Sequence, residues 1–161
     1  MIRVPKQCHC GDMKVKRHLC AVLKQRYVVG FMFNQNETAV LLINKLKPEW
    51  QKGLYNGVGG KIERGEHPDV AMIREFEEEA GIAHAPWISF AQISDPQESW
   101  IVHFYRANTQ QVFHAKSMTE EQVCLFRLDN MPENILSNLT WLIPMALDRN
   151  IRTDVITNRR G

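Results

Sequence analysis

The chain has 161 residues, and its 44% hydrophobic and 24% charged residues are the proportions of an ordinary globular domain. This composition excludes a disordered or collagen-like chain, and the length suits one domain with a sizeable core. The formal net charge of +2 excludes a strong basic field over the whole surface. The charges are segregated, however, because residues 1–26 carry seven Lys/Arg and one acid, whereas the remainder carries 13 bases and 17 acids.

The predicted elements begin with a basic N-terminal arm over residues 1–25. Two runs rich in Val, Ile, Leu and aromatic residues follow, at 26–34 and 38–44, and flank a polar turn. This pattern predicts a β-hairpin. After a polar loop, residues 54–62 predict a short strand interrupted by glycines.

The clearest helix is predicted over residues 67–80. Pro68 suits its first turn, Asp69 suits its positive end, and Gly81 suits a left-handed stop. Its buried face is expected to consist of the apolar residues that recur at helical spacing, namely Val70, Ile73, Phe76 and Ala80.

The C-terminal half continues with strands predicted at 87–93, 100–106 and 122–128. A helix is predicted over 138–149, and residues 150–161 are expected to form a loose polar tail. The inward face of this helix is expected to contain Leu142, Met145 and Ala146. This order of strands and helices predicts an α/β fold over residues 26–149, a sandwich in which a mixed β-sheet lies between helices.

A cluster of acids on the central helix carries the strongest chemical signal. Glu75, Glu78 and Glu79 share one helix face, where like charges repel one another. A solvated acidic surface is the simpler interpretation. The preceding loop, however, contains Gly57, Gly59 and Gly60, which allow a close approach of backbone to a ligand. Carboxylates beside backbone carbonyls favour Mg²⁺ or Mn²⁺, ions that commonly serve phosphate chemistry.

The segment from Gly60 to Ile82 resembles the Nudix box, G-x5-E-x7-R-E-U-x-E-E-x-G-U, in which U is bulky and apolar. Every fixed position matches at the correct spacing: Gly60, Glu66, Arg74, Glu75, Phe76, Glu78, Glu79, Gly81 and Ile82. The resemblance implies a Nudix-type α/β/α sandwich and a hydrolase that cleaves phosphorus anhydrides in nucleotides.

The resemblance also implies roles for individual residues. The metal ligands are expected to be Glu75, Glu78, Glu79 and the carbonyl of Gly59. Arg74 is expected to orient Glu75 or Glu78, with an ordinary i,i+4 ion pair as the alternative. Glu66 is expected to support the loop–helix geometry, or simply to be an acid near the start of the helix.

The catalytic site is expected to contain a proton acceptor as well as metal ligands. Mg²⁺ would neutralise phosphate charge and orient a water, and a carboxylate not committed to the metal would take its proton. In relatives this base or an extra ligand comes from a loop after the box. Glu120 and Glu121 match that location, with Glu120 the better fit; two exposed loop acids are the alternative.

The substrate-binding residues are expected from a resemblance to the oxidised purine nucleoside triphosphatase branch. The segment from Tyr55 through Lys61 resembles its W-N-G-F-G-G-K, which implies that Tyr55, Asn56 and Lys61 contact substrate. Packing in the core is the alternative for Tyr55, and a buried side chain bonded by backbone is the alternative for Asn56. Asn56 can both donate to and accept from a base edge. The branch's W-P-D-D run is replaced by residues 135–138, so only Asn138 remains there to bond a base.

These features predict a Mg²⁺-dependent pyrophosphohydrolase that converts a nucleoside triphosphate, with a modified purine as one option, to the monophosphate and pyrophosphate. The alternatives are an ADP-ribose or other dinucleotide pyrophosphatase, an RNA-end pyrophosphohydrolase and a catalytically weak nucleotide-binding module. The intact set of acids argues against the last.

The remaining expectations concern the arm and the compartment. The arm contains five potential zinc ligands, Cys8, His9, Cys10, His18 and Cys20. Their C-x-C spacing differs from the usual C-x2-C and favours a loose or strand-packed arm over a zinc site. The positive charge of the arm also allows a contact with nucleic acid, but a solvated arm is again the favoured interpretation. No signal peptide and no membrane span is apparent in the sequence, which predicts a cytoplasmic protein without membrane association. The oligomeric state is left open.

Overall fold

The computed structural model describes residues 25–95, 99–151 and 154–157. The five potential zinc ligands of the arm and the alternative of a nucleic-acid contact lie outside the described residues. The strands are β1 (Gln25–Phe33), β2 (Ala39–Asn44), β3 (Tyr55–Asn56), β4 (Ile88–Ser94), β5 (Trp100–Asn108), β6 (Val123–Arg127) and β7 (Asp154–Thr157). The helices are α2 (Pro68–Ala80) and α3 (Leu139–Leu147), with short 3-10 turns η1 (Glu49–Gln51) and η2 (Gln110–His114).

One mixed sheet contains all seven strands. Its order is β3-β2-β1-β5-β4-β7, and β6 pairs with β2. The pairs β1–β5 and β4–β7 are parallel, whereas the other pairs are antiparallel. Within the hairpin, β1 pairs with β2 at Met32 and Phe33. Nearer its start, β1 pairs instead with the glycine-containing loop. Gly30 forms a bridge with Val58, and Tyr27 forms a bridge with Lys61. The loop is thereby fixed along β1.

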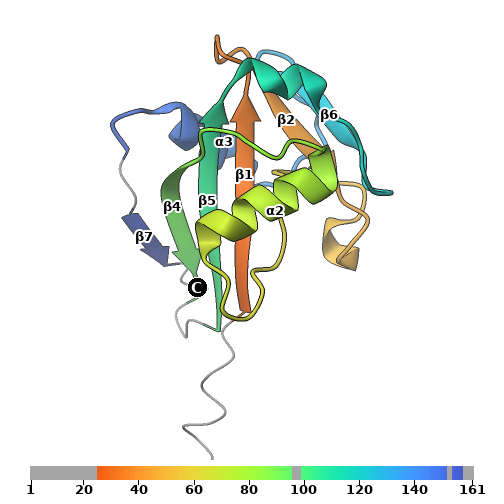
Figure 1. Ribbon diagram of the computed structural model, residues 1–161. Helices are drawn as coiled ribbons and strands as arrows, with labels where there is room; N and C mark the ends of the chain where they lie inside the picture. Colours follow the sequence, from red (N-terminus) through yellow and green to blue (C-terminus); the bar gives the residue numbers. More distant parts are fainter. Residues whose placement is uncertain (1–24, 96–98, 152–153, 158–161) are drawn as a thin grey trace, which may run out of the picture.

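The two long helices cover opposite faces of the sheet (Figure 1). On the α2 side the core contains Val28 and Met32 of β1, and on the α3 side it contains Phe31 and Phe33. This alternation is what a strand buried on both faces requires, since successive side chains point to opposite sides. The helices contribute Ala71, Met72, Phe76 and Ala80 to the first core, and Leu139, Leu142, Ile143 and Ala146 to the second. The predicted α/β/α sandwich is confirmed.

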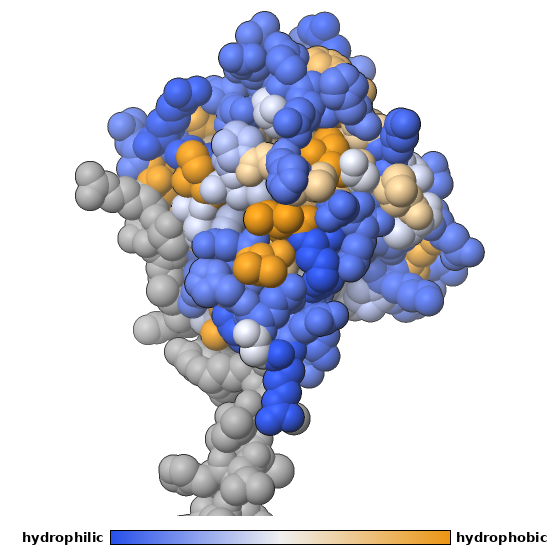
Figure 2. Space-filling model, viewed as in Figure 1, coloured by the Kyte–Doolittle hydropathy of each residue, from blue (hydrophilic) through white to orange (hydrophobic). Residues whose placement is uncertain are grey.

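The predicted buried face of α2 is wrong in two of its four residues. Val70 and Ile73 are 55% and 38% exposed, whereas Met72 is fully buried. Apolar side chains are visible over α2 in Figure 2. Compared with the orientation expected from hydrophobic spacing, α2 is rotated about its axis. Glu75 and Glu79 also lie on its sheet-facing side, with side chains only 13% and 14% exposed. The carboxylates occupy space that the hydrophobic pattern alone assigned to apolar residues.

The C-terminal region differs from the expected loose tail. Residues 154–157 form β7, which adds to the sheet edge beside β4. The polar residues on either side led to the expectation of a tail, although the segment itself contains the β-branched residues Val155, Ile156 and Thr157, which favour strands. The preceding helix ends at Leu147, two residues earlier than expected. Within the described ranges, no helix combines the length and apolarity needed to cross a bilayer.

Candidate active site

The glycine loop lies between β1 and α2, in contact with both. A Cβ atom on Gly59 would lie 2.1 Å from the carbonyl oxygen of Val28, and a Cβ on Gly60 would lie 2.4 Å from Glu75 Oε2. The carbonyl of Gly60 accepts a 2.9 Å hydrogen bond from the Val28 amide. At Gly59 the clash would be with backbone, so only glycine fits there, whereas at Gly60 it would be with the Glu75 carboxylate, which would have to move. The two glycines bring backbone directly against the acids of α2.

Arg74 connects three of the four box acids. Its guanidinium donates two hydrogen bonds to Glu66, at 2.8 and 2.9 Å, and a 2.8 Å bond to Glu75. It also reaches Glu78 at 3.2 Å and the carbonyl of Lys61 at 3.0 Å. The bonds from Arg74 lower the pKa of Glu66 to about 2, and the same contacts raise the pKa of Arg74. The arginine therefore holds the loop and the acids in one geometry.

Glu75 and Glu79 carry negative charge into a half-buried position. Burial raises the pKa of Glu79 to about 7, although Lys45 and the Gly59 amide act in the opposite direction. Burial also raises the pKa of Glu75 against the opposing effect of Arg74. Glu78, by contrast, is 57% exposed. The raised pKa values show that the neighbouring cations do not fully compensate the buried carboxylates.

The structure brings Glu121, rather than Glu120, to this cluster. Glu121 contacts the Lys45 ammonium and accepts hydrogen bonds from the Leu46 amide at 2.6 Å and the Lys47 amide at 3.2 Å. These bonds lower its pKa, although burial acts to raise it. Lys45 Nζ also lies 3.8 Å from Glu79 Oε1. The side chain of Glu120 is exposed.

Sequence reasoning missed Lys45 altogether, although strand pairing contains the signal. In the β2–β6 pair, Ile43 lies opposite Val123, and the Asn44 amide bonds the Gln122 carbonyl. Continuing this antiparallel register places Lys45 opposite Glu121. The predicted strands at 38–44 and 122–128 were not paired with each other from the sequence, so this contact stayed hidden.

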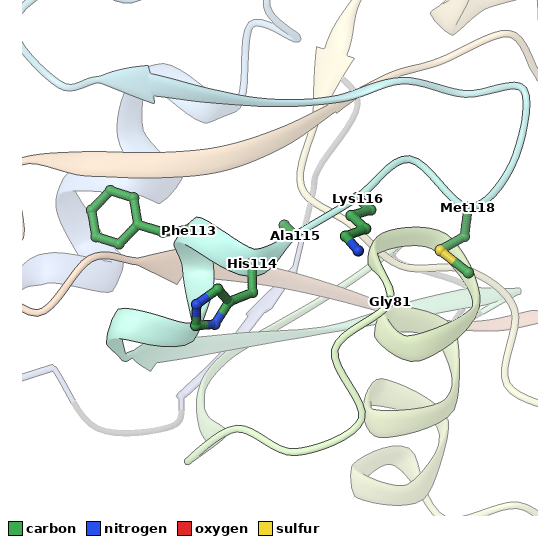
Figure 3. Close-up of a pocket in the computed structure, with 6 residues that line it drawn as sticks. All are labelled: Gly81, Phe113, His114, Ala115, Lys116 and Met118. Carbon is green, nitrogen blue, oxygen red and sulfur yellow. The ribbon is translucent and has the colours of Figure 1, made fainter.

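The segment after η2 anchors Glu121 to the helix that carries Glu79. The Lys116 amide donates to the Ala80 carbonyl at 3.0 Å, and the Met118 amide to the Glu79 carbonyl at 3.1 Å. These bonds satisfy orphan carbonyls at the C-terminal end of α2. Figure 3 shows Lys116 and Met118 beside that end of α2. Both residues line a pocket with a volume of about 620 Å³. The carboxylates of the cluster do not line this pocket.

The expected substrate contacts are divided between the two faces of the sheet. Tyr55 packs edge-on against Phe126 with ring centroids 4.8 Å apart, in the α3-side core. Asn56 pairs with Ile43, whose side chain belongs to the α2-side core. Neighbouring strand residues point in opposite directions, so Tyr55 and Asn56 do not converge. Tyr55 is occupied in packing, and its hydroxyl lies 3.8 Å from Cys124 Sγ.

The other predicted substrate-binding residues differ in their exposure and in whether their side chains are already hydrogen-bonded. The side-chain oxygen of Asn56 accepts from the Gly57 amide at 2.8 Å, and its amide donates to Gln51 at 3.3 Å. Lys61 is exposed. Asn138 precedes α3 without capping it, and its side-chain oxygen is buried with no hydrogen-bond partner. As the structure stands this oxygen is closed to solvent, so a ligand could reach it only after the side chain turned outward.

The carboxylates of the cluster are of the chemical type that binds a hard divalent cation, but their side chains are not arranged around a common metal position. Glu75, Glu78 and Glu79 supply oxygen ligands, which Mg²⁺ prefers, and two of them are buried with incompletely compensated charge. In the described part of the chain, no three His, Cys, Asp or Glu side chains are positioned to hold a metal ion as they stand. The carboxylates are instead engaged with Arg74 and Lys45.

Comparisons with known proteins agree with the fold and the box. The family model of the NUDIX domain matches residues 23–142, three quarters of the chain. The chain therefore belongs to the Nudix domain family. The family match agrees with the predicted pyrophosphohydrolase class, and the MutT and Nudix hydrolase structures share the fold.

Two solved structures and one curated relative illustrate the range of relatives. A MutT structure from work on Aliivibrio salmonicida and Vibrio cholerae is 22% identical, with a TM-score of 0.58, over 76% of this chain and 96% of that one. The NUDIX domain of Shewanella oneidensis NrtR, complexed with ADP ribose, is 16% identical, with a TM-score of 0.63, over 83% and 97%. A methanol dehydrogenase activator from Bacillus methanolicus is 30% identical over 74 residues, 45% of this chain and 40% of that protein.

Proposed function

We propose that the chain is a Mg²⁺-dependent pyrophosphohydrolase that converts a nucleoside triphosphate to the monophosphate and pyrophosphate. Mn²⁺ is the expected substitute ion. The observation that carries the proposal is the half-buried pair Glu75 and Glu79, packed against the glycine loop with charge that Arg74 and Lys45 leave incompletely neutralised. Such a pair favours a strong positive partner, and the box supplies Glu78 beside it.

The residues of the chain divide the work as follows. Glu75, Glu78, Glu79 and the Gly59 carbonyl would hold the metal, which when bound supplies phosphate charge neutralisation and an acidified water. Arg74 fixes the orientation of Glu75 and Glu78. Glu121 lies beside Glu79 and is better placed than Glu120 to accept a proton.

The substrate side of the proposal depends on two side-chain amides. Asn56 and Asn138 are proposed to bond the base, because a side-chain amide both donates and accepts hydrogen bonds. The oxygen of Asn138, which is buried and unpaired, would have to turn outward to do so. Lys61 is proposed to contact phosphate. Tyr55 is better explained as a packing residue of the α3-side core.

ADP-ribose is the second candidate substrate. The NrtR NUDIX domain, which shares this fold, was crystallised with ADP ribose, and the same acid cluster can serve any diphosphate. An RNA 5′ end is a third candidate because of the basic arm. Deleting residues 1–24 distinguishes an RNA substrate from a mononucleotide substrate. Selective loss of RNA turnover would favour RNA, whereas unchanged turnover of both substrates would show that the arm has no part in substrate binding.

The proposal is tested by assaying nucleoside triphosphates, ADP-ribose and triphosphorylated RNA with Mg²⁺. Glu78→Gln should lower turnover by about 10²-fold or more, because loss of a residue that only supports a metal ligand already costs about 10–100-fold. The matched control is Glu77→Gln, which changes the neighbouring exposed acid of the same helix. Absence of phosphate-containing product from every substrate, or equal activity of both variants, would overturn the proposal.

A further inference from the structure

Lys45 is a semi-buried cation that the acid cluster encloses. It directly follows β2, and its side chain is only 14% exposed. Its ammonium contacts Glu121 and lies 3.8 Å from Glu79. Burying an ammonium is costly unless it is paired, and here both partners are themselves 14% exposed. Lys45 is therefore the cation that offsets the charge of Glu79 and Glu121 in the metal-free protein.

Lys45 and Arg74 are held in different ways. Arg74 is fixed by hydrogen bonds to three acids and one backbone carbonyl. Lys45 presents a compact charge on a flexible four-carbon stem and contacts acids only. Glu121 would keep its place without Lys45, because the Leu46 and Lys47 amides also bond it. The ammonium can therefore leave without dismantling the site.

We propose that Lys45 is an exchangeable internal counter-ion, which the divalent cation displaces from Glu79 and Glu121. A dication bound to Glu79 and an ammonium a few ångströms away would repel each other strongly at this degree of burial. Lys45 thus holds the two acids together before loading and lowers metal affinity by competition. This inference rests on the proposed function, since it takes Glu79 as a metal ligand.

The first test uses the wild-type protein. Lysines are acylated with acetic anhydride, with and without Mg²⁺, and the modification of each site is measured by mass spectrometry. Labelling of Lys45 should rise several-fold with Mg²⁺. Lys52, in the same loop and 59% exposed near Glu49, is the internal control and should not change.

Binding of Mn²⁺, followed by electron paramagnetic resonance, separates the two possible failures. A wild-type protein that binds no Mn²⁺ would contradict the proposed function itself. A protein that binds Mn²⁺ while saturating Mg²⁺ leaves Lys45 labelling unchanged or lower would overturn the counter-ion role alone.

Substitutions provide the second test, at pH 8.5, where the carboxylates are charged. Lys45→Met should lower the Mn²⁺ dissociation constant about tenfold, because a competing charge is removed. Lys45→Arg keeps the charge and Lys52→Met removes a distant one, so neither should tighten binding. Circular dichroism checks that each variant is folded. Unchanged or weaker Mn²⁺ binding by folded Lys45→Met would contradict the proposal.

Discussion

The amide of Gly59 donates a 3.1 Å hydrogen bond to Glu79 Oε2. This bond joins the glycine loop to the last turn of α2, and Lys45 approaches the other oxygen of the same carboxylate. Glu79 is thus shared between the loop, the helix and the segment after β2. Its position depends on how closely the loop can approach β1, which gives the first prediction.

Gly59→Ala should lower the free energy of unfolding by about 1–3 kcal/mol, because its Cβ would meet the Val28 carbonyl and force the loop away from β1. Gly53→Ala is the comparison, since nothing lies within 4 Å there and only the positive φ of 80° is strained. Its cost should be nearer 1 kcal/mol. Urea unfolding measures both, and a Gly59 variant as stable as the Gly53 variant would refute the close approach.

Glu66→Gln should destabilise the protein at neutral pH but not near pH 2. The pKa of Glu66 is lowered to about 2 in the folded state by Arg74, so its ionised form stabilises the fold above its unfolded pKa near 4.5. That stabilisation is lost as the pH falls from 4.5 towards 2. The difference between wild type and variant in urea unfolding should shrink over this range, whereas exposed Glu63→Gln should show little difference at any pH.

Glu79→Gln should stabilise the metal-free protein at pH 8 but not at pH 4. The folded pKa of Glu79 is raised to about 7 by burial, so the native state binds its proton more tightly than the unfolded state does. Stability is therefore lost as the pH rises from 4.5 through 7. A gain on the order of 1–3 kcal/mol at pH 8 is expected in EDTA. A variant that is less stable than wild type at pH 8 would show that Lys45 and Gly59 fully compensate the charge.

Met72→Ala should cost about 2–5 kcal/mol in unfolding free energy, because the side chain is fully buried beneath α2. Val70→Ala, on the exposed side of the same helix, should change it by less than about 0.5 kcal/mol. Thermal or urea unfolding decides the matter. Equal losses of unfolding free energy in the two variants would contradict the observed orientation of α2 and favour the buried face expected from hydrophobic spacing.

Most of the strands and helices could be predicted because the patterns that indicate them lie within short stretches of sequence. Runs rich in Val, Ile, Leu and aromatic residues predicted β1, β2 and β4–β6 to within two residues, and the proline and glycine around α2 marked its ends. The box identified the acids because its spacing follows one helix and one loop. Tertiary contacts were not available from such patterns: the strand register that places Lys45 opposite Glu121 links residues far apart in the chain.

Two other differences have the same origin. The rotation of α2 follows from the need of Glu75 and Glu79 to face the glycine loop, which hydrophobic spacing does not record. The opposite directions of Tyr55 and Asn56 follow from their pairing with β2 in a two-residue strand. The resemblance to the oxidised purine nucleoside triphosphatase branch left Tyr55 open between a base contact and core packing, and strand geometry assigns it to core packing, on the face opposite to Asn56.

A metal-dependent reaction at Glu79 is the central feature of the proposed function. The most direct measurement is nucleotide turnover by the wild-type protein after EDTA treatment and again after Mg²⁺ is restored, beside Glu79→Gln with Mg²⁺. Turnover should disappear with EDTA, return with Mg²⁺, and fall by about 10²-fold or more in the variant, because loss of a residue that only supports a metal ligand already costs about 10–100-fold. Turnover that persists in EDTA, or a variant as active as wild type, would contradict the account.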